Sequence, residues 1–325
     1  MKSPAKLVLI GGGTGSFTLL SHLKNHFSHI TALVNMADDG GSTGILRDEL
    51  GVLPPGDVRQ CLVALARDPR VRDLFNYRFD EGTFAGHSFG NLFLTAVEKT
   101  TNDFGEAVTL ASEVLNISGK VVPITLDPVT LVADNPDNTV TRGQDVISSA
   151  VLTRPELRLE PAPRLNPAAQ EAIAEADLIV IAPGRLYGSL APALIVPGLA
   201  EALAASKAPK AYVCNLVTKP GQTDGFKVHD FAAEIERLLH NKVRLDYVLY
   251  NNARPDEELL RKYSQEGEYW VEYDENVLQN QHYKAIGGHF VQDTPWQPMA
   301  KKDMIVRTFI RHNADAVAQQ IRKIV

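Results

Sequence analysis

The chain has 325 residues, enough to bury a large core, and its 33 Lys and Arg against 39 Asp and Glu leave a net charge of −6. This mild acidity gives no electrostatic reason to expect a nucleic acid or an anionic membrane surface as partner. The apolar runs are short and interrupted, so none approaches the roughly 20 residues of a membrane-spanning helix. We expect a cytoplasmic protein that binds no nucleic acid and does not insert into a membrane.

The cysteines and the N-terminal residues agree with that location. Cys61 and Cys214 lie in apolar stretches without a CxxC spacing, which predicts buried free thiols rather than a disulfide or a metal site. The first residues lead into an apolar run and a glycine turn, without the pattern of a cleavable signal peptide.

The N-terminal part of the chain predicts a strand, a glycine turn, a helix and a second strand. Residues 6–10 are rich in β-formers, residues 16–27 have apolar side chains at helical spacing, and 29–35 form the second strand. That strand ends at an acidic, glycine-rich loop. Residues 57–67 then predict a helix with Asp57 at or near its N-cap.

The middle of the chain changes character and predicts an insert. Residues 70–77, 89–100 and 104–116 have helical patterns, so we expect a helical insert after the acidic loop. The Val- and Thr-rich stretch 120–143 predicts a β-hairpin with its turn at 136–138. Four prolines in 152–167 favour an extended crossing segment.

Strands and helices alternate again in the C-terminal half, which predicts a parallel sheet. The apolar strand in 177–184 is typical of a sheet buried on both faces. We predict an α/β fold: a Rossmann-like, doubly wound, mainly parallel sheet with a helical insert and a β-hairpin lobe. The chain forms a single domain, with its core in about 1–60 and 168–325 and the insert in about 61–167. The later elements are expected at 192–206, 210–216, 228–240, 245–252, 256–265 and, as a final strand and helix, 303–324.

Polar residues and glycines gather where the predicted parallel strands end. Ligands of such sheets bind outside the carboxyl ends of the strands. Five strand ends carry suitable residues, at 11–15, 38–41, 183–187, 215–218 and 251–252, and we expect them to form one crevice. The nucleotide- and phosphate-binding candidates from this region are Gly11, Gly12, Gly13, Thr14, Gly15, Gly40, Gly41, Ser42, Gly184, Asn215 and Thr218.

The segment GGGTGS (11–16) is a glycine turn before a helix. It departs from GxGxxG, because Ser16 occupies the third glycine position, and from the P-loop, because no Lys-Ser or Lys-Thr follows. Backbone amides at such a helix N-terminus can bind a phosphate; the alternative is a tight turn without a ligand. An NAD site is disfavoured, because a lone acid would be expected after the second strand.

Two neighbouring carboxylates, Asp38 and Asp39, precede Gly40, and Asp57 follows a second glycine. Mg²⁺ commonly takes one or two carboxylates and completes its shell with water and phosphate oxygens. The three aspartates are therefore candidate Mg²⁺ ligands, with one of the neighbouring pair facing the metal and the other orienting it or capping the backbone. The alternatives are a solvated turn for the pair and N-capping for Asp57.

Four further polar residues offer contacts to a phosphate or a reacting group. Arg47 and Arg59 can clamp phosphate oxygens, or be ordinary exposed arginines. His87 and Asn91 in GHSFGN precede a helix. His87 can act as a base or donate to a phosphate, or be a structural histidine.

The motifs IGGGTG, ADDGGSTGILRDELGVLPPGDVRQCLVAL, GHSFGN, APGRLYGS, CNLVTKPGQTDGF and YNN resemble one family in their order, nearly from end to end. The chain is similar to the 2-phospho-lactate transferase (CofD-like) superfamily, and its acidic loop resembles that of the YvcK branch, the bacterial gluconeogenesis factors. For the transferases, the resemblance implies Mg²⁺-dependent transfer of a phospholactyl-type group from a nucleotide-diphosphate carrier. It places the metal-binding and catalytic acids at Asp38, Asp39 and Asp57.

For the YvcK branch, the resemblance implies binding of UDP-sugars such as UDP-N-acetylglucosamine and regulation of gluconeogenic growth, cell-wall synthesis and cell shape. Its nucleotide-sugar residues match Tyr263, which can stack on uracil, and Arg311, which can pair with a phosphate. The chain departs from the family pattern at Arg185 and Gly188, in place of Ser and Thr, and at Lys219 and Gln222. These departures bear on which nucleotide fits.

Three hypotheses from different classes stand at this point. The first is a nucleotide-sugar-binding regulator without turnover, favoured by the type of acidic loop and the lack of a convincing nucleophile. The second is a Mg²⁺-dependent transferase, because the aspartates suit metal-assisted displacement and one can take a proton from the acceptor. The third, an NAD-type oxidoreductase, is disfavoured by the glycine turn. The expected partner is a small-molecule nucleotide, and a homodimer is common for this class of fold.

Overall fold

A parallel β-sheet forms the centre of the molecule, which a computed structural model describes at residues 2–135, 139–292 and 310–325. All neighbouring strands in this sheet pair in parallel, as the alternation of strands and helices predicted. In spatial order the strands are β10 (Lys284–Gly288), β9 (Tyr247–Asn251), β8 (Lys210–Val213), β7 (Leu178–Ile181), β1 (Ser3–Gly11), β2 (Phe27–Val34) and β3 (Lys120–Pro123).

The strand order reverses next to β1. From β1 the chain moves outward through β2 to β3, and it then returns to β7, which pairs with the other side of β1. The register aligns Ile10 of β1 with Leu33 of β2 and Ile181 of β7, so the three strands end at a similar level. In open α/β sheets such a reversal leaves a crevice at the carboxyl ends of the diverging strands.

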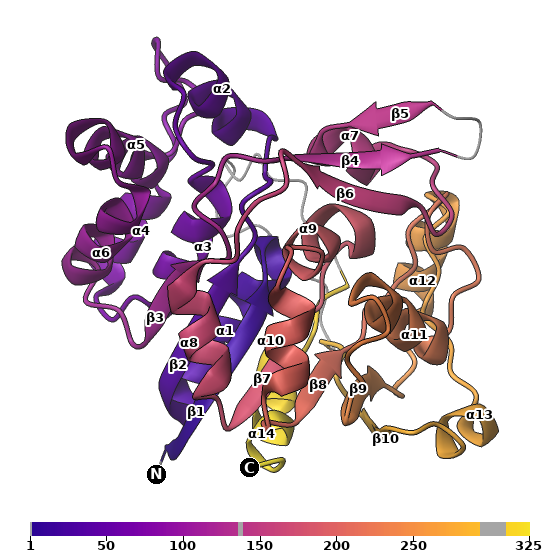
Figure 1. Cartoon of the computed structure of the whole chain (residues 1–325). Helices are drawn as coiled ribbons and strands as arrows, with labels where there is room; N and C mark the ends of the chain where they lie inside the picture. The colour runs from indigo at the N-terminus through magenta and orange to yellow at the C-terminus, as the bar shows by residue number, and fades with distance from the viewer. Residues whose placement is uncertain (1, 136–138, 293–309) are drawn as a thin grey trace.

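Helices cover both faces of the larger sheet, which confirms the doubly wound arrangement. Figure 1 shows α8 (Pro167–Ala174) and α10 (Leu199–Ala205) in front of the strands and α14 (Ala314–Arg322) behind them. On that rear face α14 packs against α1 (Gly13–His26). Every residue of β7 is buried, as expected for a strand covered on both sides.

The predicted helical insert lies at one side of the sheet (Figure 1). Phe75 ties two of its helices together, because its ring centroid lies 5.7 Å from that of Phe89 and 5.1 Å from that of Phe93. The sequence patterns missed one helix, because the second half of the acidic loop folds as α2. The helices on this side are α2 (Gly41–Leu50), α3 (Gly56–Leu65), α4 (Pro69–Asn76), α5 (Phe89–Thr101) and α6 (Phe104–Val114).

A small antiparallel sheet lies beyond the carboxyl ends of the larger one (Figure 1), with β4 (Thr130–Asp134) between β5 (Val140–Arg142) and β6 (Glu156–Glu160). The hairpin prediction is confirmed for β4 and β5, whose turn at 136–138 lies outside the described residues. One expectation was wrong, because the start of 120–143 is β3 of the larger sheet. The segment predicted as extended, 152–167, contains the strand β6, which was not foreseen.

Prolines misled the prediction for β6, because they flank this strand rather than interrupt it. Pro155 precedes Glu156 and Pro161 follows Glu160, so the strand keeps its backbone donors for pairing with β4. Residues 144–149 between the small strands form the helix α7 (Gln144–Ser149).

The single helix expected at 192–206 is broken. A π-helical turn, η1 (Leu186–Leu190), leads into α9 (Ala191–Leu194), and α10 follows only after Gly198, whose φ is +91°. The predicted helices α11 (Val228–Leu238) and α12 (Glu257–Gln265) are confirmed, and α13 (Glu275–Gln279) was not foreseen. The final helix is α14, whereas the strand expected before it falls largely in 303–309, outside the described residues.

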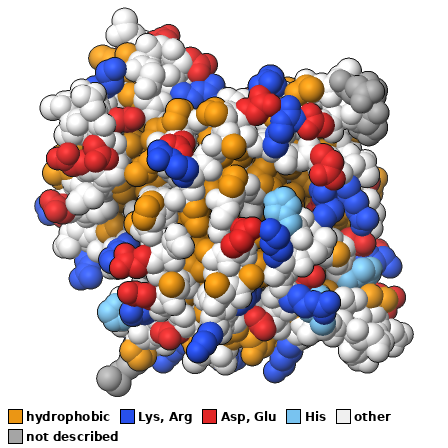
Figure 2. Space-filling view, viewed as in Figure 1, with side chains coloured by type: hydrophobic (Ala, Val, Ile, Leu, Met, Phe, Trp, Pro, Cys, Tyr) orange, Lys and Arg blue, Asp and Glu red, His pale blue; other side chains and the backbone are white. Residues whose placement is uncertain are grey.

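Surface and core agree with a sheet wrapped by helices. Both cysteines are buried and free, as predicted. Figure 2 shows charged side chains of both signs interspersed over this face, with hydrophobic side chains gathered in its middle. In the described part of the chain, no single helix is long and apolar enough to cross a membrane. One pair, Leu186–Leu194 and Leu199–Ala205, meets the test only when joined, and it is bent by 70°.

Candidate functional site

The glycine turn between β1 and α1 is held against a carboxylate. The helix begins at Gly13, whose φ of +65° is in the left-handed region that favours glycine. Its amide donates to Oδ1 of Asp57 at 2.9 Å, and a Cβ on Gly12 would lie 2.3 Å from Oδ2 of Asp57. Gly12 is the N-cap residue and supplies no side-chain cap. The amides of this first helical turn are thus suited to an anion.

The buried Asp57 and the half-buried Asp38 form a pair of interacting carboxylates. Burial and the neighbouring charge of Asp38 raise the pKa of Asp57 to about 7. Burial likewise raises the pKa of Asp38, whose Oδ1 accepts from the Gly40 amide at 3.2 Å and whose carboxylate also accepts from Thr43. The N-cap of α3 is Pro55, so Asp57 does not cap its own helix. Two mutually repelling carboxylates, one buried and one half-buried, favour a cation or a proton between them.

Asp39 faces a different part of the molecule. Its Oδ2 accepts from the amide of Gln144 at 2.9 Å and its Oδ1 from the amide of Asp145 at 2.8 Å, at the start of α7. Nη1 of Arg47 lies 3.8 Å from the same carboxylate, while its Nε donates to Asp48 at 2.8 Å. One member of the aspartate pair therefore holds the backbone, as the sequence allowed, and the other faces Asp57.

The donor set at Asp38 and Asp57 fits Mg²⁺ in part. Oxygen ligands from one or two carboxylates, completed by water and phosphate oxygens, are what this ion prefers. Among the residues that the structure describes, no three His, Cys, Asp or Glu side chains are grouped to hold a metal. A cation here would therefore depend on a ligand for most of its coordination.

A second polar cluster joins α2 to the insert. α2 begins at Gly41, after the N-cap residue Gly40. Next to it, Oγ of Ser42 lies 2.9 Å from Nδ1 of His87, and Nδ2 of Asn91 donates to the same Oγ at 3.4 Å. Since Asn91 donates, the proton of the Ser42 hydroxyl can be given to His87. The cluster presents a histidine and a hydroxyl together.

Arg59 has a structural place in this cluster. It is 5% exposed, its Nε donates to Oδ1 of Asn91 at 2.9 Å and its Nη1 donates to Oδ1 of Asn76 at 2.7 Å. A Cβ on Gly90 would lie 2.8 Å from the Arg59 side chain. The guanidinium thus joins α3, α4 and α5 inside the insert.

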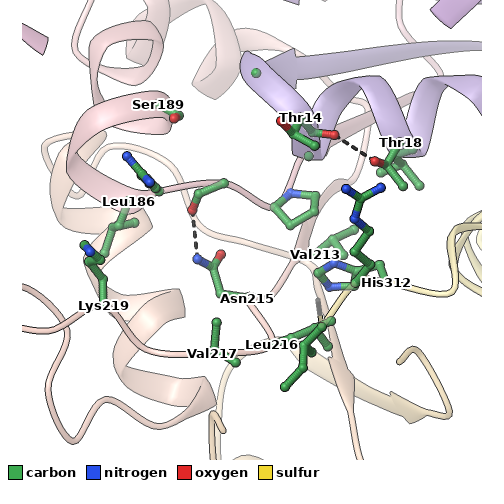
Figure 3. Close-up of a pocket in the computed structure, with 18 of the residues that line it drawn as sticks. Thr14, Thr18, Leu186, Ser189, Val213, Asn215, Leu216, Val217, Lys219 and His312 are labelled. Atoms are coloured by element: carbon green, nitrogen blue, oxygen red, sulfur yellow. Dashed lines mark hydrogen bonds between the residues drawn. The ribbon is translucent and has the colours of Figure 1, made fainter. Parts of the chain in front are cut away.

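A cavity of about 370 Å³ opens where the strand order reverses. Its walls include 12–15 after β1, 183–186 after β7, 215–219 after β8, and 310–312 before α14. Cavities of a few hundred Å³ at this position of an α/β sheet commonly hold small ligands. Figure 3 shows Asn215 between the Thr14 and Thr18 side and the Lys219 and Leu186 side.

The expected meeting of five strand ends is realised for three of them. The ends of β1, β7 and β8 line the cavity. Asp38, in the loop after β2, does not line the cavity. It interacts with Asp57 at the start of α3, and Asp57 accepts from the Gly13 amide of the glycine turn. The end of β9 is not among the residues that line the cavity. There Oδ1 of Asn251 accepts from the Phe290 amide at 3.0 Å and its Nδ2 donates to Ala253.

Close backbone contacts set the shape of the cavity. A Cβ on Gly15 would lie 1.9 Å from the carbonyl oxygen of Pro183. The Asn215 side chain donates from Nδ2 to the carbonyl of Gly184 at 2.8 Å. Thr218 accepts at Oγ1 from the Tyr269 amide at 3.0 Å. Of these candidates, Gly15, Gly184, Asn215 and Thr218 all line the cavity.

Tyr263 supports the cavity wall without lining it. It is 4% exposed, packs with Leu216 and Ile310 in a small satellite core, and its hydroxyl accepts from the Ile310 amide at 2.8 Å. Arg311, which follows Ile310 in the chain, lines the cavity. Tyr263 therefore fixes the backbone that presents Arg311.

Sequence reasoning missed several lining residues. His312 lines the cavity, and its Nε2 lies 3.0 Å from the carbonyl oxygen of Cys214. Burial lowers the pKa of His312 to about 4, so it is neutral and donates. Glu268 lines it too, from a loop without a recognisable motif. Arg185 and Lys219 also contribute; their only signal was their departure from the family pattern.

A parallel sheet of Rossmann type, with a cavity where its strand order reverses, makes this an α/β protein with the usual ligand-binding position of that class. Comparison with known proteins specifies it further. The family model described as "2-phospho-L-lactate transferase CofD" matches residues 7–291, which is most of the chain. The chain therefore belongs to the CofD family.

Relatives and solved structures agree with this assignment. A Thermotoga maritima protein is 45% identical over 282 residues, covering 85% of this chain and 88% of its own. The "Gluconeogenesis factor" of Bacillus subtilis is 39% identical over 329 residues, covering 98% and 97%. The crystal structure of a UPF0052 family member from Bacillus halodurans superposes with a TM-score of 0.88 at 37% identity, covering 98% of this chain and 99% of that one.

Proposed function

We propose that this protein binds a nucleoside-diphosphate sugar, a UDP-sugar such as UDP-N-acetylglucosamine, and acts as a regulator of gluconeogenic growth, cell-wall synthesis and cell shape. The observation that carries the binding proposal is the first turn of α1, which lines the cavity with residues 12–15 and whose N-cap residue, Gly12, has no side chain; Asp57 accepts from the Gly13 amide. Backbone amides there suit the diphosphate, and Arg311, which also lines the cavity, adds a fixed positive charge. The regulatory part rests on the relatives named gluconeogenesis factor.

Mg²⁺ would be held by Asp38 and Asp57 with the help of phosphate oxygens. Bound there, it would neutralise charge on the diphosphate and on the two carboxylates. The protein's own part is to place amides and carboxylates on the two sides of one glycine turn. Asp39 contributes by anchoring the loop to α7.

A second candidate is a transferase that uses a nucleotide-diphosphate-activated donor of the phospholactyl type. The observation favouring it is the Ser42–His87 contact at 2.9 Å, which offers a proton acceptor beside the acidic loop. In this reading His87 or Asp57 accepts the proton of the acceptor hydroxyl, and the glycine turn holds the departing nucleotide.

Calorimetry and product analysis separate the two candidates. UDP-N-acetylglucosamine, GDP and NADH are each titrated with and without Mg²⁺, and the mixtures are then incubated and analysed for released nucleotide. Tight UDP-sugar binding without product supports the regulator. Metal-dependent release of nucleotide supports the transferase. Binding of NADH alone contradicts both.

A further inference from the structure

The cavity carries cationic side chains at two separate places. His312 lies on the side of Thr14 and Thr18, whereas Lys219 lies on the opposite side with Leu186 (Figure 3). Arg311 directly precedes His312 in the chain and also lines the cavity. Arg185 directly precedes Leu186 and also lines the cavity. One anionic group in a ligand can satisfy only one of these two places.

The far place has an excess of positive charge. Glu268 is the one carboxylate among the lining residues of this cavity. Nζ of Lys219 lies 3.9 Å from its Oε1, which is longer than a hydrogen bond. Lys219 and Arg185 act on the Glu268 carboxylate electrostatically, and so does the negatively charged Glu266, which does not line the cavity. Among the lining residues at this place, two cations and one carboxylate leave a single net positive charge.

Partial burial makes the charge of Lys219 more effective, whereas Arg185 is exposed. The side chain of Lys219 is 34% exposed and that of Glu268 is 16% exposed, so solvent screens them less than it screens a free surface pair. An Arg fork and a Lys ammonium together suit a carboxylate, which can accept from both. A dianionic phosphate would exceed the single charge that is available.

We propose that the preferred ligand is a nucleotide sugar whose sugar bears a carboxylate, and that Arg185 and Lys219 bind this carboxylate at the end of the cavity away from the glycine turn. The proposal rests on the proposed nucleotide-sugar function and specifies its substrate class. Two groups of contacts then orient the ligand: amides and Arg311 on the diphosphate, and the Arg185–Lys219 pair on the acidic sugar.

The test uses two probes that differ only at the sugar C6 position, UDP-glucuronate and UDP-glucose, titrated by calorimetry into the full chain with Mg²⁺. We expect UDP-glucuronate to bind about tenfold more tightly or better, as charge-assisted contacts allow. The ratio should fall as salt is added. In an Arg185→Gln/Lys219→Gln variant the ratio of the two affinities should approach 1.

A matched control and an opposite variant keep the result interpretable. Lys207→Gln/Arg244→Gln removes the same charges from exposed positions outside the cavity lining and should preserve the ratio. Glu268→Gln removes the competing carboxylate and should increase it. Equal affinities in the unchanged chain overturn this inference while leaving nucleotide-sugar binding intact. Failure to bind either probe overturns the proposed function and this inference with it.

Discussion

The Asp57 carboxylate accepts a hydrogen bond from the Gly13 amide at 2.9 Å, although the two residues are 44 positions apart in the chain. This contact joins the first turn of α3 to the first turn of α1. The acidic pair and the anion-binding turn are therefore parts of one unit. A diphosphate at the turn and a cation at the carboxylates would stabilise each other across it.

Replacing Asp57 by Asn should separate binding from folding. The amide oxygen of Asn can still accept from Gly13, while the repulsion with Asp38 disappears, so the unfolding temperature without ligand should stay the same or rise. Mg²⁺-dependent nucleotide affinity should fall about tenfold or more, measured by calorimetry. Asp73→Asn, at an exposed carboxylate, is the control. A large loss of unliganded stability would show that the carboxylate is mainly structural.

Gly15→Ala should change the shape of the cavity, because Gly15 is part of its wall. The added methyl would lie 1.9 Å from the Pro183 carbonyl oxygen, which is backbone and cannot turn aside. We expect a loss of about 1–3 kcal/mol in the free energy of unfolding, measured with urea, together with weaker nucleotide binding. Gly184→Ala is the comparison, because its nearest neighbours are Leu190 side-chain atoms at 3.3 Å, which can adjust. Equal losses in the two variants would argue against the close approach of the first turn of α1 to the loop after β7.

Tyr263→Phe should weaken ligand binding without touching the ligand. The change removes only the hydroxyl that accepts from the Ile310 amide, and an unpaired buried amide costs about 1–3 kcal/mol. Because Arg311 follows directly, its placement should loosen and UDP-sugar affinity should drop several-fold. Tyr269→Phe, at a residue that is 56% exposed, should leave both the free energy of unfolding and the UDP-sugar affinity unchanged. If the two variants behave alike, Tyr263 does not position Arg311.

His312 should make the protein less stable in mild acid. Burial lowers its pKa from the usual 6.5 to about 4, so between these values the unfolded chain binds the proton and the folded chain does not. The free energy of unfolding therefore falls as the pH decreases through this window, by about 2 kcal/mol from pH 7 to pH 5.

Urea unfolding of a His312→Gln variant at both pH values measures this contribution. The glutamine amide can still donate to Cys214, and the variant should lose most of the difference between pH 7 and pH 5. His29→Gln, at an exposed histidine, should retain it. An unchanged difference in His312→Gln would assign the acid sensitivity to other groups.

Much of the fold could be predicted because its signals are local. The strands β1, β2 and β7 to β9 are apolar runs, and the glycine turn follows the first of them directly. β6 was missed because the same prolines fit an irregular segment and a strand with proline at both ends. The break before α10 was missed because the apolar pattern continues through Pro197 and Gly198.

The parts of the site that are formed by backbone groups could be predicted from the sequence. The parts that depend on which partner a side chain contacts were harder to predict. Glycines at the strand ends correctly indicated where the cavity lies. The sequence allowed one aspartate of the pair to bind backbone, but which one depends on α7, about a hundred residues later. Arg59 looked equally suited to a phosphate, and only the fold shows that Asn76 and Asn91 hold it. Glu268 has no local pattern, because its role depends on the distant Lys219.

Asp38 and Asp39 share one peptide bond yet serve opposite neighbours: one faces the glycine turn through Asp57, and the other is fastened to α7 beneath the small sheet. Any shift of this dipeptide on filling or emptying the crevice must either stretch the two amide contacts of Asp39 or drag α7 along. The two amide contacts of Asp39 thus couple the position of the acidic loop to that of α7.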